Sequence, residues 1–192
     1  MQLLVHMQLE SDTIFGNGMS MPGGEDICIQ TDLQGFPFLK GSTLKGIFRE
    51  ELINLLSWMK MPEEKAIDTV RNLMGESGAD DTSSRKLVFS DLTMHPDVIE
   101  RIEREEGITS QEIIEMLTYL RTFTELEDGI AKGEALRTAR CIKKGLNFYG
   151  TCTCAKDDVE IVQEVLRLIK WAGSMRSRGF GKVRVRGEEI RS

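Results

Sequence analysis

The order in which strand-like and helix-like segments follow one another restricts the fold of this chain more than any other feature. Residues 2–10 place apolar side chains at alternate positions, which is the pattern of a strand with one buried face. Five further core segments are predicted after it: a helix from Ser42 or Thr43 to Leu56, strands at 86–91 and 148–155, a helix at 159–171 and a strand at 182–188. The core order is therefore strand, helix, strand, strand, helix, strand.

This order predicts an α+β fold with a ferredoxin-like (modified RRM) core, extended by insertions after the first strand and after the first helix. A length of 192 residues suits one domain that spans 1–192. The loop after the first strand is rich in glycine, with a short strand expected at 27–30. So long a loop in a compact domain is usually functional or disordered.

The second insertion, at about 60–120, is predicted to be helical. Helices are expected at 62–74, 97–106 and 110–120, and Thr109 with Glu112 forms a capping box before the last of them. The polar stretch that follows, at about 121–147, contains the turn dipeptide Asp128-Gly129. We expect this stretch to form a hairpin that projects from the body.

The composition is that of a globular protein, with 40% hydrophobic and 29% charged residues. No apolar run is long enough to span a bilayer, and the N-terminus lacks the pattern of a signal peptide. We therefore expect a cytoplasmic protein without a membrane partner. The four cysteines form no CxxC pair, so we expect buried thiols, with a zinc site at Cys152 and Cys154 as the alternative.

The charge of the chain is unevenly distributed. The net charge is -6, and acidic residues concentrate at 97–128, whereas 167–186 holds basic residues and no acidic ones. The basic segment can hold phosphates that the acidic segment would repel. The acidic segment fits a protein partner, such as a neighbouring copy of the chain, better than RNA.

Two segments combine glycines with basic residues. The first is Gly41-Ser42-Thr43-Leu44-Lys45-Gly46, a helix start whose backbone N–H groups favour a phosphate. Lys45 and Arg49 are four residues apart and share a helix face, which we place opposite the apolar stripe. A Walker A loop is excluded because no Gly-Lys-Ser/Thr tripeptide occurs. The alternative is an ordinary capped helix with solvated basic residues.

The second segment runs from Gly173 to Lys182. Its glycines allow close approach of a ligand to the backbone, and the Arg176 and Arg178 guanidinium groups suit phosphate oxygens. Phe180 either supports a base or plugs the sheet. From the two segments together we predict that RNA is bound by Gly41, Ser42, Lys45, Arg49, Arg176, Arg178, Gly179, Phe180 and Lys182.

These two segments resemble motifs of the RAMP superfamily of CRISPR-associated proteins. The stretch Gly41 to Gly46 looks like the helix-opening motif of that family, in which a proline usually occupies the place of Lys40. The stretch Ser177-Arg178-Gly179-Phe180-Gly181 looks like its glycine-rich loop, and Asp91 fits the end of the strand after the variable loop. The order of segments and the insertions most resemble the backbone subunit of type III effector complexes.

The resemblance implies a subunit that binds crRNA, stacks with copies of itself and with other CRISPR-associated subunits, and inserts the hairpin at 121–147 as a thumb between guide and target RNA. It also implies that Asp26 cleaves the target RNA with Mg²⁺ or another divalent cation, which would stabilise the transition state. Glu25 and Asp32 are the alternative carboxylates in the same loop.

Three other functions remain open from the sequence. The chain could be a non-catalytic RAMP subunit that binds crRNA and caps or scaffolds the complex. It could process guide RNA with His6 as acid or base; on parity His6 shares a strand face with Gln2 and Leu4. It could also be a ferredoxin-like interaction module that binds no RNA.

Overall fold

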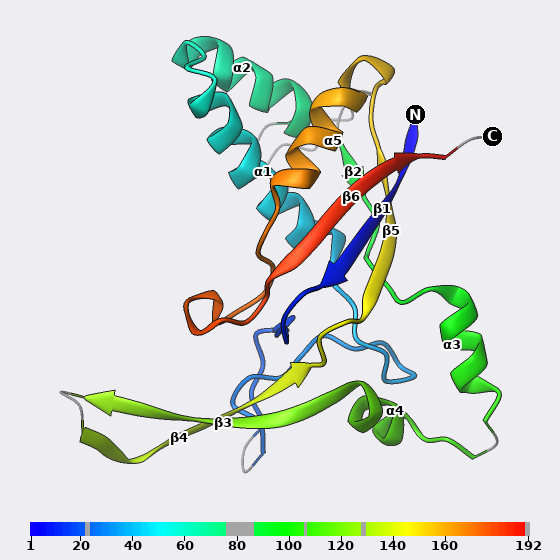
Figure 1. The fold of residues 1–192 in the computed structure, drawn as a ribbon, viewed down its shortest axis with the longest axis vertical. Coiled ribbons are helices and arrows are strands. Elements are labelled where there is room, and N and C mark those ends of the chain that lie inside the picture. The colour runs from blue at the N-terminus through cyan, green and yellow to red at the C-terminus, as the bar shows by residue number, and fades with distance from the viewer. Residues whose placement is uncertain (22–23, 76–86, 106, 128–129, 191–192) are drawn as a thin grey trace.

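The computed structural model describes residues 1–21, 24–75, 87–105, 107–127 and 130–190, and for 124–127 and 130–135 it describes the backbone alone. Its main sheet has four strands: β1 (Gln2–Leu9), β2 (Val88–Phe89), β5 (Asn147–Thr153) and β6 (Val183–Glu189). They are ordered β2-β5-β1-β6, and every neighbouring pair is antiparallel (Figure 1). The first strand of the chain therefore occupies the interior of the sheet.

One face of this sheet is covered by helices and the other is open. Helices α1 (Gly41–Trp58) and α5 (Val159–Leu168) pack against the covered face (Figure 1). Apolar side chains at alternate positions of β1 point into this layer and are at most 1% exposed: Leu3, Val5, Met7 and Leu9. The intervening Leu4, His6 and Gln8 lie on the open face, which confirms the predicted parity of His6.

Helix α1 buries the apolar stripe read from the sequence, but its N-terminal cap differs from the prediction. The cap residue is Lys40, not Ser42 or Thr43, and no side chain of the helix start supplies the cap. Instead, the Asp91 carboxylate accepts a hydrogen bond of 2.7 Å from the Gly41 N–H. A Cβ on Gly41 would lie 2.4 Å from the Phe89 carbonyl oxygen, so glycine is needed here for close packing.

A two-stranded hairpin of β3 (Thr118–Glu127) and β4 (Ile130–Ile142) lies apart from the main sheet and extends beyond the body (Figure 1). Its bounds differ from the predicted 121–147. Helix α4 (Ser110–Leu117) ends before the predicted residue 120, and β3 begins at the next residue. The predicted turn at 128–129 lies outside the described residues.

The remaining elements follow the predictions with shifted ends. Helix α2 (Glu63–Met74) has Pro62 as its cap residue, α3 (Pro96–Glu103) is shorter than predicted, and the capping box of α4 is present. The strand predicted at 86–91 corresponds to β2, which is shorter and belongs to the main sheet. Single-turn 3₁₀ helices occur at η1 (Lys156–Asp158) and η2 (Arg176–Arg178).

The loop after β1 is tied to the rest of the fold by single bridges. Where a strand was expected at 27–30, Ile27 bridges Ala139 of β4 and Ile29 bridges Gly16 within the loop. The bridge from Ile27 joins the loop to the hairpin, whereas the bridge from Ile29 closes the loop on itself.

Candidate nucleic-acid interface

The two glycine-containing segments of the sequence line the same groove. This groove has a volume of about 430 Å³ and lies where the loop after β1, the start of α1 and the loop before β6 meet. Lys40 and Thr43 line it from α1, and Gly173, Ser174 and Arg176 line it from the loop before β6. Segments that are far apart in sequence thus form a single concave surface with basic side chains.

The glycines of the loop before β6 are required by backbone packing. A Cβ on Gly173 would lie 2.5 Å from the Ile14 carbonyl oxygen, and one on Gly181 would lie 2.1 Å from that of Ala172. Both glycines also have positive φ angles, of 87° and 79°. The close packing fixes the loop, while Arg176 remains exposed and its Nε donates only to the Gly173 carbonyl, at 3.2 Å.

Phe180 plugs the junction between this loop and the hairpin. It is 2% exposed and meets Phe123 of β3 edge to face, with ring centroids 5.6 Å apart. The Arg121 guanidinium carbon lies 5.1 Å from the centre of the Phe180 ring, and that of Arg178 lies 5.4 Å from the centre of Phe123. The ring is thus packed inside the protein, and its predicted contact with RNA stays a prediction. Arg178 therefore extends from the loop towards the hairpin.

The predicted basic residues Lys45 and Arg49 do not line the groove. The side of α1 that lines it contains Thr43 and Ile47, whereas Arg49 borders a separate hollow of about 550 Å³ between α1 and α2. Lys45 is half-buried near Cys152. Burial, with Cys154 nearby, raises the pKa of the Cys152 thiol to about 12, and the Lys45 charge opposes this rise.

The other predicted contacts are distributed around the groove. Ser42 and Gly179 are exposed, whereas Gly41 is buried with its N–H bonded to Asp91. Lys182 lies just past the loop, with its Nζ 3.4 Å from a Glu10 carboxylate oxygen. The sequence analysis did not select Lys40 and Thr43. Thr43 could have been found from helical spacing, because residues 43 and 47 share one face of the helix and residue 45 does not lie on it.

Asp26 is exposed at the base of the hairpin. Its carboxylate accepts a hydrogen bond of 2.6 Å from the Thr138 N–H on β4, and its own N–H donates to the Thr138 carbonyl at 2.8 Å. The neighbouring Glu25 is committed elsewhere, because it forms an ion pair of 2.5 Å with Arg140. Asp32 accepts amide hydrogen bonds from Gln34 and Phe36 and so closes its own turn.

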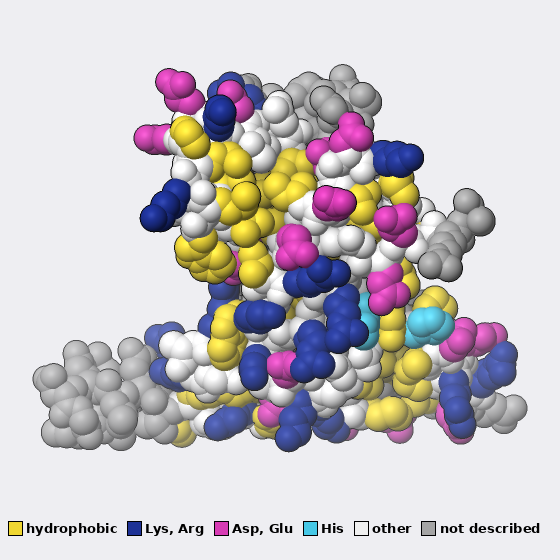
Figure 2. Space-filling view, turned by 45° about the horizontal axis from the view of Figure 1, so that its top comes forward, with side chains coloured by type: hydrophobic (Ala, Val, Ile, Leu, Met, Phe, Trp, Pro, Cys, Tyr) yellow, Lys and Arg dark blue, Asp and Glu magenta, His cyan; other side chains and the backbone are white. Residues whose placement is uncertain are grey.

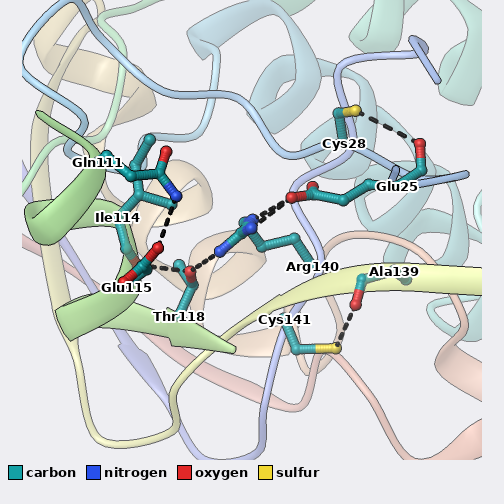
Figure 3. A network of polar contacts seen from close by, with 9 residues as sticks. All are labelled: Glu25, Cys28, Gln111, Ile114, Glu115, Thr118, Ala139, Arg140 and Cys141. Atoms are coloured by element: carbon teal, nitrogen blue, oxygen red, sulfur yellow. Dashed lines mark hydrogen bonds and ion pairs between the residues drawn. The ribbon is translucent and has the colours of Figure 1, made fainter. Parts of the chain in front are cut away.

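Arg140 connects the loop that carries Asp26 with both strands of the hairpin. Figure 3 shows its guanidinium group between the Glu25 carboxylate and the Thr118 hydroxyl, to which it donates at 3.1 Å. The Thr118 hydroxyl in turn donates to the Ile114 carbonyl of α4. The side chains of Arg140 and Glu25 are each 12% exposed, so this ion pair is largely shielded from water.

The donor set around Asp26 limits how a metal ion could be held. Within the described parts of the chain, no three His, Cys, Asp or Glu side chains gather into a metal-binding group. Mg²⁺ is commonly bound by one or two carboxylates together with phosphate oxygens and waters. Asp26 therefore fits Mg²⁺ only as one ligand, with oxygens of a bound nucleic acid as further ligands.

His6 lies on the open face of the main sheet, not among the residues that line the groove. Its ring stacks on Tyr149 with centroids 4.8 Å apart, and its Nε2 is 2.9 Å from Asn147 Oδ1. His95 is the cap residue of α3 and meets the same Tyr149 edge to face. The structure thus separates His6 from the carboxylates near the hairpin.

Comparison with known families identifies the chain at the level of the superfamily. The model of the RAMP superfamily matches residues 6–184, which include both glycine-containing segments, strands β2 and β5, and parts of β1 and β6. The chain belongs to the RAMP superfamily. No curated protein matches it. Among its described residues, no helix has the length and apolar character needed to cross a membrane.

Solved structures support the same fold for this RAMP protein. A chain of the "Cryo-EM structure of the Type III-B Cmr-beta bound to cognate target RNA" aligns with a TM-score of 0.69 and 13% identity, covering 97% of each chain. A chain of the "Type III-B Cmr-beta Cryo-EM structure of the Apo state" aligns with a TM-score of 0.69 and 12% identity, covering 97% of this chain and 96% of the other. At such identities the likeness establishes the fold.

Proposed function

We propose that this RAMP protein is a crRNA-binding backbone subunit of a type III CRISPR RNA-guided effector complex. The observation that carries the proposal is the groove in which the start of α1 and the loop before β6 meet, with Lys40 and Arg176 on its walls. Membership of the RAMP superfamily and the likeness to chains of Cmr-beta, one of them solved with target RNA, support it.

The chemistry of the groove suits a single-stranded RNA backbone. The Arg176 guanidinium can donate two parallel hydrogen bonds to a phosphate, and the Lys40 ammonium adds a second positive charge. The Thr43 hydroxyl can donate to a phosphate oxygen or accept from a ribose 2′-hydroxyl, a group that distinguishes RNA from DNA. The glycines at 173 and 181 keep the backbone close to this surface.

In this proposal the main sheet, with its order β2-β5-β1-β6 and two covering helices, is a ferredoxin-like core, and the β3–β4 hairpin is the thumb. The antiparallel pairing and the central place of β1 support the first assignment. The hairpin's extension beyond the body, with its base next to the loop before β6, supports the second.

RNA binding can be tested on the isolated protein with a labelled single-stranded RNA. Arg176→Gln is expected to weaken binding and to reduce the slope of log affinity against log salt by about 0.7, because one phosphate contact is lost. Arg167→Gln is the matched control, since Arg167 is an exposed arginine on α5 paired with Glu164 and does not line the groove. Equal affinity and slope in the two variants would refute the proposed groove.

We further propose that Asp26 takes part in cleavage of the target RNA. Among the three candidate carboxylates of its loop, Asp26 is exposed and is fixed to the hairpin by the Thr138 backbone, whereas Glu25 is held in an ion pair. A divalent cation bound there would neutralise charge on the scissile phosphate. Asp26 itself would hold the cation beside RNA that lies across the base of the hairpin.

Cleavage is tested with the assembled complex, complementary RNA and Mg²⁺. Wild-type complex should give products at a fixed spacing, and Asp26→Asn should abolish them while binding persists, because an amide oxygen can still accept the Thr138 N–H bond. Asp32→Asn serves as the control. Full cutting by Asp26→Asn removes Asp26 from the mechanism, and intact RNA with the wild-type complex favours a non-catalytic subunit that binds crRNA and caps or scaffolds the complex.

The exposed acidic side chains of α3 and the residues after it fit contact with a neighbouring subunit better than contact with RNA. Glu103→Lys combined with Glu105→Lys should therefore disturb assembly with copies of the chain or with other subunits, and leave RNA affinity of the isolated protein unchanged. Sedimentation of the mixed subunits measures the first effect. Loss of RNA affinity without a change in assembly would contradict this assignment.

A further inference from the structure

The open face of the main sheet carries a second basic hollow, separate from the groove. It has a volume of about 160 Å³ and is lined by His6, Gln8, Arg184 and Arg186. The strand register explains the grouping, because Arg186 pairs with His6 and Arg184 pairs with Gln8 across β6 and β1. Figure 2 shows lysine and arginine side chains gathered beside a histidine on this side of the molecule.

The two arginines of this hollow differ in their partners. Arg184 lies 2.6 Å from Glu10, which also lies 3.4 Å from Lys182. Although desolvation opposes the change, the charges of these two basic residues lower the pKa of Glu10. Arg186 is exposed, and its side chain has no ion pair or hydrogen bond among the described residues. Within the described part of the chain, the hollow therefore keeps a positive charge without a counter-charge.

His6 forms a fixed wall of the hollow. Asn147 Nδ2 donates to the Gly145 carbonyl at 3.2 Å, so its Oδ1 is turned towards His6 and accepts from the Nε2–H. The ring is also held by its stack on Tyr149, with planes only 8° apart. The hollow thus combines a ring held in place with the guanidinium groups of Arg184 and Arg186, and Arg184 is positioned before a ligand arrives by its ion pair with Glu10, which reduces the entropy lost on binding.

We propose that Gln8, Arg184 and Arg186, beside the fixed ring of His6, bind a backbone phosphate of single-stranded RNA on the open face of the sheet. This inference rests on the proposed function and extends the RNA path beyond the groove. Lys182, Arg184 and Arg186 occupy successive outward positions roughly 6.6 Å apart along the strand. That interval is close to the step between successive phosphates of an extended single strand, and the row begins next to the glycine loop of the groove.

The row of basic residues favours RNA over an acidic protein surface. Guanidinium groups match phosphate oxygens with two parallel hydrogen bonds, and Gln8 adds an amide donor from the neighbouring strand. Lys182, the first residue of the row, directly follows Gly181 of the loop that bears Arg176, so the proposed RNA path runs from the groove along the row. If a carboxylate of a partner subunit occupied the hollow instead, its binding would not depend on Arg176.

The test uses the full chain and a labelled single-stranded RNA, with affinity measured over a series of salt concentrations. Arg186→Gln is expected to weaken binding about fivefold, the contribution of one exposed charge pair. It should also reduce the slope of log affinity against log salt by about 0.7, and Arg186→Gln combined with Arg176→Gln should reduce it by about 1.4. Arg186→Lys keeps the positive charge and should therefore retain most of the wild-type slope of log affinity against log salt. Arg167→Gln is the control.

The outcomes separate this inference from the proposed function. If Arg176→Gln weakens RNA binding and Arg186→Gln has the same RNA affinity as the Arg167→Gln control, the proposed site on the open face of the sheet (the sheet-face site) is wrong and the groove is supported. If Arg186→Gln spares RNA affinity but weakens association between subunits, the occupant is an acidic protein surface and the inference is overturned. If neither Arg176→Gln nor Arg186→Gln changes RNA affinity, both the groove and the sheet-face site are wrong.

Discussion

Arg140 is the residue whose loss should most clearly reveal how the hairpin is attached. Arg140→Met removes the guanidinium group from Glu25 and from the Thr118 hydroxyl, and leaves the Glu25 carboxylate in a site where that side chain is only 12% exposed. Removing one partner of a buried ion pair costs roughly 3–5 kcal/mol. We take about 3 kcal/mol, since Glu25 retains some contact with water and can turn towards it.

This loss can be measured by thermal unfolding. In a domain of this length a loss of 1 kcal/mol lowers the melting temperature by roughly 2–4 °C, so Arg140→Met should lower it by about 6–12 °C. Glu25→Gln in the Arg140→Met background should recover part of the loss, because it removes the unpaired charge. Arg167→Met, which breaks an exposed pair with Glu164, should cost less than about 1 kcal/mol.

The double-mutant cycle decides whether the ion pair is the cause. A coupling energy of at least about 1 kcal/mol between Arg140→Met and Glu25→Gln is expected for residues in direct contact. Additive effects of the two substitutions, or a melting temperature of Arg140→Met equal to that of Arg167→Met, would refute the account of Arg140 as the tie between loop and hairpin.

Three further predictions concern the core and the helix start. Phe180→Ala should cost roughly 3–5 kcal/mol in urea unfolding, while Phe180→Leu should cost far less and leave RNA affinity intact; a large loss of affinity in Phe180→Leu would indicate that the ring contacts RNA. Asp91→Ala should cost about 1 kcal/mol, because the Gly41 N–H loses its cap, and no loss would mean that water replaces the carboxylate. Burial raises the pKa of the Cys141 thiol to about 11 and that of the Cys152 thiol to about 12, from about 8.5 in an unfolded chain. Both thiols should therefore resist an aromatic disulfide reagent in the native protein at pH 8, and rapid labelling there would contradict this. Because the unfolded chain loses these protons first, the free energy of unfolding should fall as the pH rises from about 8.5 towards 12.

The sequence predicted those features that depend on local periodicity. Alternation along β1 placed His6 on the open face, and the spacing of Thr109 and Glu112 located the start of α4, because both patterns follow from the geometry of a single element. The predicted end of α4 was wrong because it depends on contacts with residues far away in the chain. Thr118 pairs with Ile142 and bonds with Arg140, and this long-range pairing ends the helix three residues before the predicted boundary.

The residues lining the groove depended on contacts that sequence spacing does not encode. The cap of α1 comes from Asp91, which is distant in the chain, and packing of α1 on the sheet sets which side of the helix meets the loop before β6. Lys40 and Thr43 therefore line the groove in place of the predicted Lys45 and Arg49. The loop carboxylates Glu25 and Asp26 were found from the resemblance, but their different partners are visible only in three dimensions.

The contacts around Phe180 have a mechanical consequence. Phe180 from the loop before β6 and Phe123 from the hairpin alternate with the guanidinium groups of Arg121 and Arg178, and the Phe180 ring is anchored in the core. Because Phe123 belongs to the hairpin and Phe180 to the loop before β6, any change in the tilt of the hairpin must alter the packing between these two rings. The same loop carries Arg176, so the orientation of the hairpin and one wall of the groove depend on a shared contact.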